Sequence, residues 1–264
     1  LAFQDKLAAG RYFDPAAGIG NFLTETYISL RRLENEVLHE LYGQEIVLGG
    51  LDNPIKVNIG QFYGIEINDF AVTVARTALW IAESQMMKET ESIVHIALDF
   101  LPLRTYDNIH EGNALRMDWR AILPPTDAVR VMGNPPFVGY SLQTKEQKDE
   151  LLTVYVDEQN KPYKTSGKID YVAGWYFKAA EYMAGTKIHA AFVSTNSITQ
   201  GEQVAGVWKP LYERFHIMLQ FAYRTFRWDS ESTKKAAVHC VIVGFCAGNT
   251  AENKRLYLNG QIKE

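Results

Sequence analysis

The sequence predicts an α/β fold with a doubly wound, mostly parallel sheet, and three observations support this. Short apolar runs alternate with amphipathic helical patterns along most of the chain, as in repeated β-α units. The runs are apolar almost throughout, which is typical of strands covered by helices on both faces. The last two runs, 217–223 and 236–245, follow each other without a helix between them. We therefore expect a seven-stranded sheet with an antiparallel hairpin at one edge.

The individual elements follow from the spacing of the apolar residues. The expected strands cover residues 11–13, 62–67, 110–115, 128–132, 188–194, 217–223 and 236–245. Apolar residues recur at intervals of three and four in the expected helices, 21–41, 69–87, 170–184 and 203–215. The polar stretches 42–60 and 88–108 are interpreted as insertion loops, and 143–168 as a surface loop or a short helix pair.

Length, charge and composition limit the classes of protein. The 264 residues suffice for one large α/β domain, so we expect a single domain over 1–264. A net charge of −4 argues against a free-standing nucleic-acid-binding module. Cys240 and Cys246 are too far apart on one predicted strand to pair, which suggests a reducing, cytoplasmic setting. The chain carries no apolar stretch of membrane-spanning length. It starts at Leu1 rather than at Met, so we expect it to be a fragment of a longer polypeptide.

The first candidate site is the turn after the first predicted strand, FDPAAGIGNF. Gly18 and Gly20 allow the backbone to approach a ligand, and a helix N-terminus follows them. The third glycine of a nicotinamide-binding fingerprint is missing, and the carboxylate of Asp14 would repel a pyrophosphate. These two features disfavour a nicotinamide oxidoreductase. Asp14 suits a ligand with an ammonium group, and a purely structural turn is the alternative.

The second candidate is Glu66, at the carboxyl end of the second expected strand. An acidic residue in this place can accept hydrogen bonds from both hydroxyls of a ribose, and Ile67 can pack on an attached ring. A carboxylate at a strand end is, by itself, more often simply solvated. Its place one β-α unit after the first motif favours the functional interpretation.

The third candidate is the sequence Asn134-Pro135-Pro136-Phe137, directly after a buried strand. The two prolines fix the backbone and remove two N–H donors, which leaves carbonyl oxygens free to accept hydrogen bonds. The Asn134 side-chain oxygen and the Pro135 carbonyl can together hold one planar NH₂ group. Phe137 offers a face on which a substrate ring can stack. A rigid surface turn is the structural alternative.

The ordered motifs DPAAGIGNFL, YGIEI, GNAL and NPPF resemble those of the amino-methylating DNA methyltransferases, in the order typical of the adenine-specific members. The stretches AAFVSTNSITQGEQV, RTFRW and KKAAVHCVIVGF are similar to the methylase domain of MmeI-like (type IIL) restriction-modification enzymes. This resemblance covers essentially the whole chain. It implies a Rossmann-like fold, S-adenosylmethionine as cofactor, and methylation of the N6 amino group of a flipped-out adenine in DNA.

The resemblance also implies roles for individual residues. The residues expected to bind the cofactor are Asp14, Pro15, Ala16, Gly18, Gly20, Asn21, Phe22, Glu66, Ile67, Asn113 and Ala114. Asn134, Pro135, Pro136 and Phe137 would hold the target base. A second aromatic residue near the last hairpin would stack on the base. Phe226 is the first choice and Trp228 the second, with core packing as the alternative for both.

One departure from the family pattern concerns the first turn. The family usually has a small Cys or Ser where this chain has Ala17 and Ile19. Ile19 either faces the core or weakens cofactor binding, and we expect binding to survive.

The expected main partner is double-stranded DNA, held mostly by a recognition domain outside this fragment. Arg224, Arg227, Lys234 and Lys235 could add phosphate contacts. No metal-ligand spacing is present, and no metal is expected to take part in methyl transfer. The alternatives are methylation of another planar amine (cytosine N4, an RNA base or a protein glutamine) and a non-catalytic cofactor- or DNA-binding module.

Overall fold

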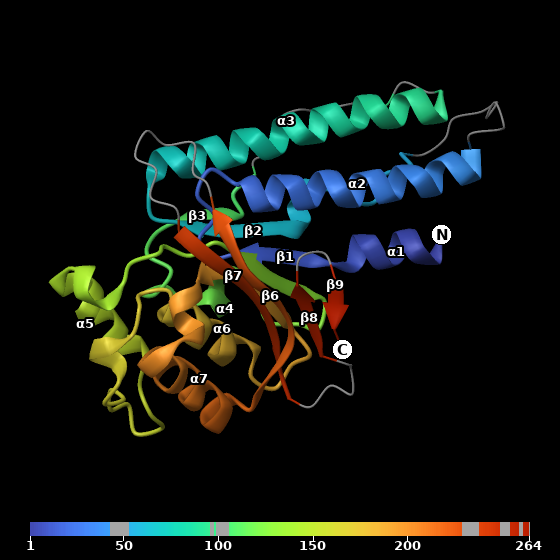
Figure 1. Ribbon diagram of the computed structural model, residues 1–264. Helices are drawn as coiled ribbons and strands as arrows, with labels where there is room; N and C mark the ends of the chain where they lie inside the picture. Colours follow the sequence, from blue (N-terminus) through green and yellow to red (C-terminus); the bar gives the residue numbers. More distant parts are fainter. Residues whose placement is uncertain are drawn as a thin grey trace. The chain divides into compact units, whose positions relative to one another are not determined.

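The computed structural model confirms the α/β class, with parallel strands to which antiparallel strands are added (Figure 1). The structure describes residues 1–42, 53–95, 98, 106–228, 238–248, 254–258 and 261–263. The chain divides into two units, Leu1–Asn113 and Ala114–Glu264. The single domain expected over residues 1–264 stays a prediction.

The described residues of unit 1 form three parallel strands and three helices. Its helices are α1 (Ala2–Ala9), α2 (Asn21–Tyr42) and α3 (Asp69–Val94), and its strands are β1 (Arg11–Asp14), β2 (Phe62–Glu66) and β3 (Ile109–Glu111). The strand order is β3-β2-β1, and Asp14 lies in register with Gly64 and Glu66 with Glu111. Helices α2 and α3 lie side by side (Figure 1). The carboxyl ends of all three strands therefore meet at one edge, where the predicted cofactor residues lie.

Helix α3 shows why these helices form where they do, and it corrects one predicted boundary. Its buried positions, Val72, Ala75, Leu79, Ala82 and Met86, follow the spacing of three and four that was used to predict it. The Asn68 side chain caps it by accepting a hydrogen bond from the Ala71 N–H at 2.9 Å. The helix continues to Val94, so the prediction of a loop from residue 88 was wrong there. Thr90 and Val94 are buried and extend the same apolar face through a polar stretch.

Unit 2 contains the remaining elements. Its helices are α4 (Trp119–Ile122), α5 (Lys145–Val154), α6 (Ala173–Met183) and α7 (Gly201–Phe215). Its strands are β4 (Val129–Gly133), β5 (His189–Thr195), β6 (Ile217–Trp228), β7 (Val238–Ala247), β8 (Arg255–Leu258) and β9 (Gln261–Lys263), in the order β4-β5-β7-β6-β8-β9. The described residues also form short 3-10 helices. One lies in unit 1, η1 (Ile59–Gln61), and three lie in unit 2, η2 (Tyr140–Leu142), η3 (Ser166–Lys168) and η4 (Asn196–Thr199).

The last two predicted strands pair as expected, but they do not end the sheet. β6 and β7 are antiparallel, and β7 lies between β5 and β6. β8 then pairs in parallel with β6, and β9 pairs with β8, so the expected edge hairpin lies inside the sheet. The described residues therefore form nine strands where seven were expected. The two additional strands are short and carry exposed charged residues, so their sequence has no clear apolar pattern.

The core of unit 2 is rich in aromatic residues contributed by α6. The Tyr176 ring stacks on Phe245 at 5.3 Å between centroids and meets Phe192 edge-on at 5.3 Å. Its hydroxyl pairs with Ser194 Oγ at 2.8 Å, so the buried oxygen has a partner. Tyr176 and Phe177 are both buried. Phe177 meets the rings of Tyr155, just after α5, and of Phe215 in α7 at 4.5 and 5.0 Å between centroids, so it belongs to the core between the helices. Residues 170–172 precede the helix instead of belonging to it.

Candidate functional site

The predicted cofactor residues of unit 1 are joined by backbone hydrogen bonds at the carboxyl ends of the strands. The Ala17 N–H donates to the Ile65 carbonyl at 2.9 Å, and the Gly18 N–H donates to Glu66 Oε2 at 2.9 Å. The Gly112 N–H, just after β3, donates to the Glu66 carbonyl at 2.9 Å. The turn after β1, the end of β2 and the turn after β3 therefore meet around Glu66.

The two glycines of the first turn, Gly18 and Gly20, are required for different structural reasons. Both have positive φ, 54° at Gly18 and 86° at Gly20, where other residues are strained. A Cβ at Gly20 would lie 3.0 Å from Ala75 Cβ, so this glycine lets the start of α2 approach α3. A Cβ at Gly18 would meet no atom of the described residues within 4 Å. The open side of the turn is therefore at Gly18, where a ligand can approach the backbone.

Asp14 is a buried carboxylate with one oxygen left without a partner. Its Oδ1 accepts a hydrogen bond from the Ala16 N–H at 2.9 Å, whereas Oδ2 has no partner among the described residues. Burial raises the pKa of Asp14 to about 7, with a smaller contribution from the negative charge of Glu66 and partial compensation by the Ala16 hydrogen bond. A cation bound here would relieve the desolvation of the carboxylate. The site thus fits the ammonium group of a methionine moiety.

Glu66 retains hydrogen-bonding capacity although both of its oxygens are engaged. Oε2 accepts from Gly18, and Oε1 accepts from the Asn68 N–H at 3.0 Å. A carboxylate has about four lone-pair positions, so the free ones can accept the two hydroxyls of a ribose. Ile67, directly after it, is 66% exposed and offers an apolar surface to a ligand ring.

Phe70 is an exposed aromatic residue that the sequence reasoning did not single out. It lies in the first turn of α3, four residues after Glu66, and is 73% exposed. A signal was present in the sequence, because Phe70 is out of phase with the buried positions of the helix. A large apolar side chain on the exposed face of a helix next to a binding motif is a candidate ligand contact.

The other predicted cofactor residues lie in the same turn or close to it along the chain. Pro15 is buried, Ala16 and Phe22 are half-buried, and Asn21 is exposed at the start of α2. Asn113 is half-buried and is the last residue of unit 1. Ala114 begins unit 2, where it is buried and its carbonyl accepts a hydrogen bond from Trp119 Nε1 at 2.8 Å. The roles of these residues in cofactor binding stay predictions.

The structure separates the two unusual residues of the first turn. Ala17 is buried, and its Cβ lies 3.0 Å from the position that a Cβ on Gly64 would take. Ile19 is 49% exposed, so the interpretation that it faces the core was wrong.

In unit 2, the Asn134-Pro135-Pro136-Phe137 segment follows β4 directly, as predicted. The Asn134 Oδ1 atom is buried and has no hydrogen-bond partner among the described residues. Pro135 is buried, Pro136 is exposed, and Phe137 is half-buried. A buried amide oxygen without a partner costs free energy unless a ligand supplies the donor. The segment therefore presents an acceptor to a bound NH₂ group and a partly exposed ring next to it.

Phe226, the first choice for a second stacking residue, lies near the end of β6. Its strand partner in β7 is Cys240, which is also the partner of Thr195 at the end of β5. Since Gly133 of β4 pairs with Phe192 of β5, Phe226 lies at the same end of the sheet as Asn134. A β-bulge between Tyr223 and Phe226 changes the side to which the following residues point. The ring of Phe226 is half-buried, so its stacking role stays a prediction.

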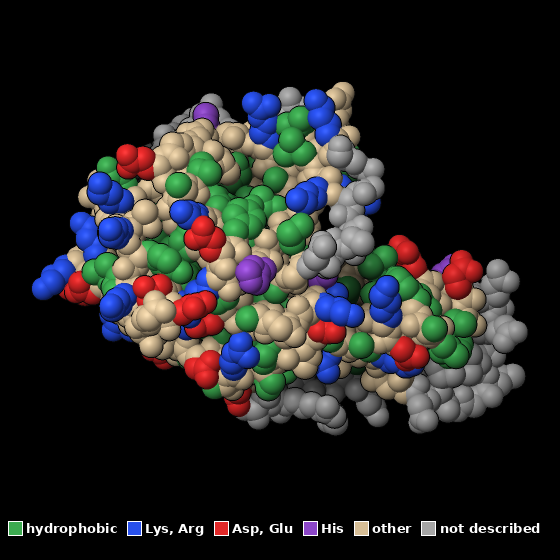
Figure 2. All heavy atoms as spheres, turned by 90° about the horizontal axis from the view of Figure 1, so that it is seen from below, with side chains coloured by type: hydrophobic (Ala, Val, Ile, Leu, Met, Phe, Trp, Pro, Cys, Tyr) green, Lys and Arg blue, Asp and Glu red, His purple; other side chains and the backbone are tan. Residues whose placement is uncertain are grey.

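Most of the remaining candidates for DNA contact lie outside the described residues. Trp228 ends β6, but its side chain and that of Arg227 lie outside the described residues, as do Lys234 and Lys235 entirely. Arg224 is exposed. Basic and acidic side chains are interspersed over the face shown in Figure 2.

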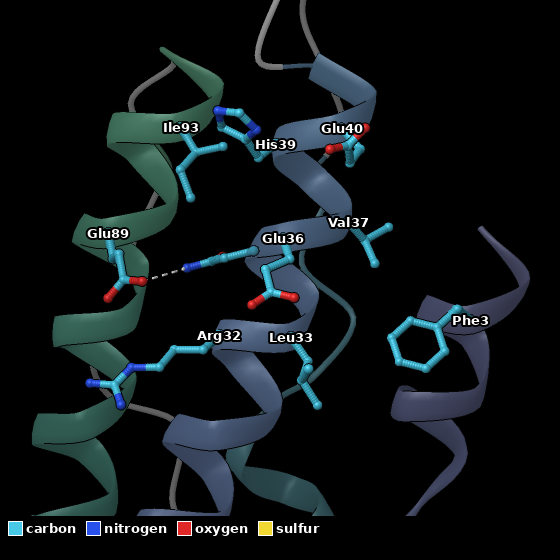
Figure 3. A pocket seen from close by; sticks show the side chains of 10 residues that line it. Phe3, Arg32, Leu33, Glu36, Val37, His39, Glu40, Glu89 and Ile93 are labelled. Atoms are coloured by element: carbon cyan, nitrogen blue, oxygen red, sulfur yellow. Dashed lines mark hydrogen bonds between the residues drawn. The ribbon is translucent and has the colours of Figure 1, made fainter.

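A separate hollow of about 710 Å³ lies between α1, α2 and α3, away from the predicted motifs in the sequence (Figure 3). Its lining includes the apolar side chains of Phe3, Leu33 and Ile93 and the charged side chains of Arg32 and Glu36. It contains none of the predicted site residues.

Within the described ranges, no helix combines the length and apolarity needed to cross a membrane. The same ranges hold no group of three or more His, Cys, Asp or Glu side chains arranged to bind a metal ion. Cys240 and Cys246 are both buried on strand β7.

The mostly parallel α/β sheet is that of a Rossmann-like methyltransferase domain. The chain belongs to the family described as "MmeI, DNA-methyltransferase domain", whose model matches residues 1–258. This confirms the resemblance seen in the sequence.

Individual relatives agree with this assignment. DNA methyltransferase A of Bacillus subtilis (strain 168) is 43% identical over 253 residues, which are 94% of this chain and 28% of that protein. The type IIL restriction-modification enzyme MmeI in complex with DNA is 41% identical with a TM-score of 0.87, covering 99% of this chain and 35% of that one. The ATP-dependent type ISP restriction-modification enzyme LlaBIII bound to DNA shares the fold. It is 14% identical, with a TM-score of 0.57 over 96% of this chain and 18% of that one. The chain thus spans about a third of the length of the first two relatives.

Proposed function

We propose that this chain transfers the methyl group of S-adenosylmethionine to the exocyclic N6 amino group of an adenine in DNA, as the modification part of a restriction-modification system. One observation carries the proposal. Asn134 presents a buried side-chain oxygen without a partner directly after β4, followed by Pro135 and the partly exposed ring of Phe137. A planar amine is the group that such an acceptor arrangement suits.

The residues of unit 1 fit S-adenosylmethionine by their chemistry. The unpartnered Oδ2 of Asp14 would pair with the ammonium group, and Glu66 would accept the ribose hydroxyls. Ile67 would contact the adenine ring of the cofactor through its exposed side chain. When bound, the cofactor supplies an electrophilic methyl group on a sulfonium sulfur.

The residues of unit 2 would make the target amine nucleophilic. Asn134 Oδ1 and the Pro135 carbonyl would each accept one N–H of the NH₂ group, and these hydrogen bonds would help the nitrogen lone pair to leave conjugation with the ring. The nitrogen lone pair would then be available to attack the methyl carbon while the bond from that carbon to the sulfonium sulfur breaks, and the methylated amine would release one proton to water. Phe137, with Phe226 as a second stacking residue, would hold the base by its faces. The base must leave the duplex, which costs a few kcal/mol of stacking and pairing.

The family and its DNA-bound relatives support DNA as the substrate. The structures similar to this chain include restriction-modification enzymes solved with DNA. The net charge of −4 favours a DNA grip supplied mainly outside these residues, and we propose double-stranded DNA in the bacterial or archaeal cytoplasm as the partner.

Methyl transfer with tritiated S-adenosylmethionine and DNA, followed by nucleoside analysis, tests the proposal. The full-length protein should yield N6-methyladenine, and an Asn134→Ala variant should lose about 10³-fold in rate because one acceptor of the amine is gone. Label in N4-methylcytosine would show that the substrate is the other exocyclic amine of DNA. Label in RNA or in protein glutamine alone would contradict a DNA substrate, and absence of cofactor binding would contradict an enzyme.

A further inference from the structure

The segment that follows Phe137 is fastened to a short stretch before α6. The Tyr171 N–H donates to the Val138 carbonyl at 2.9 Å, and the Tyr140 N–H donates to Asp170 Oδ1 at 3.0 Å. The Gln143 side chain donates to the Ile169 carbonyl at 2.8 Å. Three hydrogen bonds thus join residues 138–143 to residues 169–171. The first of them lies one residue after Phe137.

Asp170 is the centre of this contact because its Oδ2 atom and its backbone N–H make hydrogen bonds to two further elements, η4 and α7. Its Oδ2 accepts a hydrogen bond from Ser197 Oγ at 2.5 Å, and Ser197 in turn pairs with Thr195 Oγ1, at the end of β5, at 2.7 Å. Its backbone N–H donates to Gln203 Oε1 of α7 at 3.0 Å. Asp170 is 7% exposed, so these bonds are shielded from water.

Tyr171 fastens the same segment to α5. Its hydroxyl donates to Glu150 Oε2, and Glu150 Oε1 is paired with Arg116 at 2.7 Å. Glu150 is also 7% exposed. The backbone after Phe137 is therefore held by groups that are themselves bonded to β5, α7 and α5.

We infer that Asp170 is a positioning residue for the Asn134–Phe137 segment, an inference that rests on the proposed function of that segment. The prolines fix the backbone dihedrals within the segment, but they do not fix its direction as it leaves β4. The hydrogen bond from Tyr140 to Asp170, together with that from Tyr171 to Val138, sets this direction. A displacement of about 1 Å in a group that holds the substrate lowers rates by about 10²-fold.

The substitution Asp170→Ala removes both acceptors, whereas Asp170→Asn keeps the shape. The asparagine oxygen can still accept from Tyr140, and its NH₂ group can bond to Ser197 Oγ. In the full-length protein, Asp170→Ala should lower kcat for methyl transfer by about 10²-fold, with Kd for S-adenosylmethionine within about twofold of wild type. Asp170→Asn should recover kcat to within about fivefold of wild type. The control Tyr182→Phe removes another buried hydrogen bond of unit 2, that to the Leu123 carbonyl, and should leave kcat unchanged.

Hydrogen-deuterium exchange of the peptide that covers residues 134–143 separates this inference from the proposed function. Faster exchange confined to this peptide in Asp170→Ala, and absent in Tyr182→Phe, supports the inference whatever the enzyme methylates. Unchanged exchange and unchanged kcat in Asp170→Ala overturn it. Equal losses of kcat in Asp170→Ala and Asp170→Asn also overturn it, because they would show that charge rather than geometry matters. If Asp170→Ala does not fold, Ser197→Ala replaces it, with a smaller loss of kcat expected and an unchanged kcat counting against the inference.

Discussion

Among the described residues of unit 1, two carboxylates are buried, Glu34 and Asp14, and their surroundings are opposite. Glu34 accepts hydrogen bonds on both oxygens: from Gln4 Nε2 and Lys56 N at 2.7 Å each, from Val57 N, and from the Arg31 guanidinium. Asp14 accepts one hydrogen bond on Oδ1, and its Oδ2 has none from any described residue. Both side chains are shielded from water, so the difference lies in the number of partners.

The difference separates a group that holds the fold from one that is prepared for a ligand. The Glu34 network connects α1, α2 and the segment before β2, and Arg31 extends it to Thr90 of α3 through a hydrogen bond of 2.6 Å. Such a network makes a structure specific, and breaking one member leaves the others unsatisfied. A buried carboxylate without partners lowers the stability of the free protein. A cation that binds to it removes this penalty, and the gain contributes to the binding free energy. Substitutions at the two sites should therefore affect different properties.

The largest expected effect of this kind is on stability, at Arg31. Arg31→Met removes the buried cation and leaves Glu34 charged in the protein interior. We expect the free energy of unfolding to fall by about 3–5 kcal/mol, measured by urea denaturation at neutral pH. The neighbouring Arg32 is exposed, and Arg32→Met should change the free energy of unfolding by less than about 0.5 kcal/mol. Loss of cofactor affinity from folded Arg31→Met protein would contradict a purely structural role.

The next effect has opposite signs for stability and for binding. Asp14→Asn removes a buried charge, so the free protein should become more stable at pH 8 by about 1–3 kcal/mol. The same variant should bind S-adenosylmethionine about 10²-fold more weakly, because the ammonium group loses its carboxylate partner. Thermal unfolding and calorimetry measure the two quantities. A variant that is less stable and binds normally would place Asp14 with Glu34 as a structural residue.

The raised pKa of Asp14 also predicts how binding depends on pH. The pKa of Asp14 in the folded protein is about 7, above its ordinary value of 3.8. The protonated form of Asp14 therefore stabilises the free protein fully below pH 3.8, and this stabilisation is lost as the pH rises through about 7. The ammonium group of the cofactor favours the ionised form. Affinity should therefore increase about tenfold per pH unit up to about pH 7 and then level off. Calorimetry between pH 5.5 and 7.5 tests this, and Asp14→Asn should abolish the slope.

The sequence predicted those features that depend on local pattern. The places of Asp14, Glu66 and Asn134 at strand ends followed from apolar runs and from the residues after them, and the structure confirms these places. The continuation of α3 to Val94 was missed because tertiary packing, not propensity, buries Thr90 in a polar stretch.

Long-range contacts were harder to predict. The insertion of β7 between β5 and β6 and the addition of β8 depend on pairings between distant residues. The role inferred for Asp170 was missed for the same reason. Its partners, Tyr140 and Ser197, lie about 30 residues before and 27 after it, and no local motif contains all three residues.

The smallest expected effect concerns Ile19, which lies between the two glycines of the cofactor turn. Its side chain is 49% exposed, and the turn is formed by the backbone of Gly18 and Gly20 instead. Ile19→Ser should therefore change the Kd for S-adenosylmethionine by less than about threefold, that is, by less than about 0.7 kcal/mol. Gly20→Ala is the matched contrast, because a Cβ there would lie 3.0 Å from Ala75 Cβ at a positive φ, and its affinity should fall much further. A tenfold change with Ile19→Ser, in either direction, would show that this side chain contacts the cofactor and that the turn depends on more than its glycines.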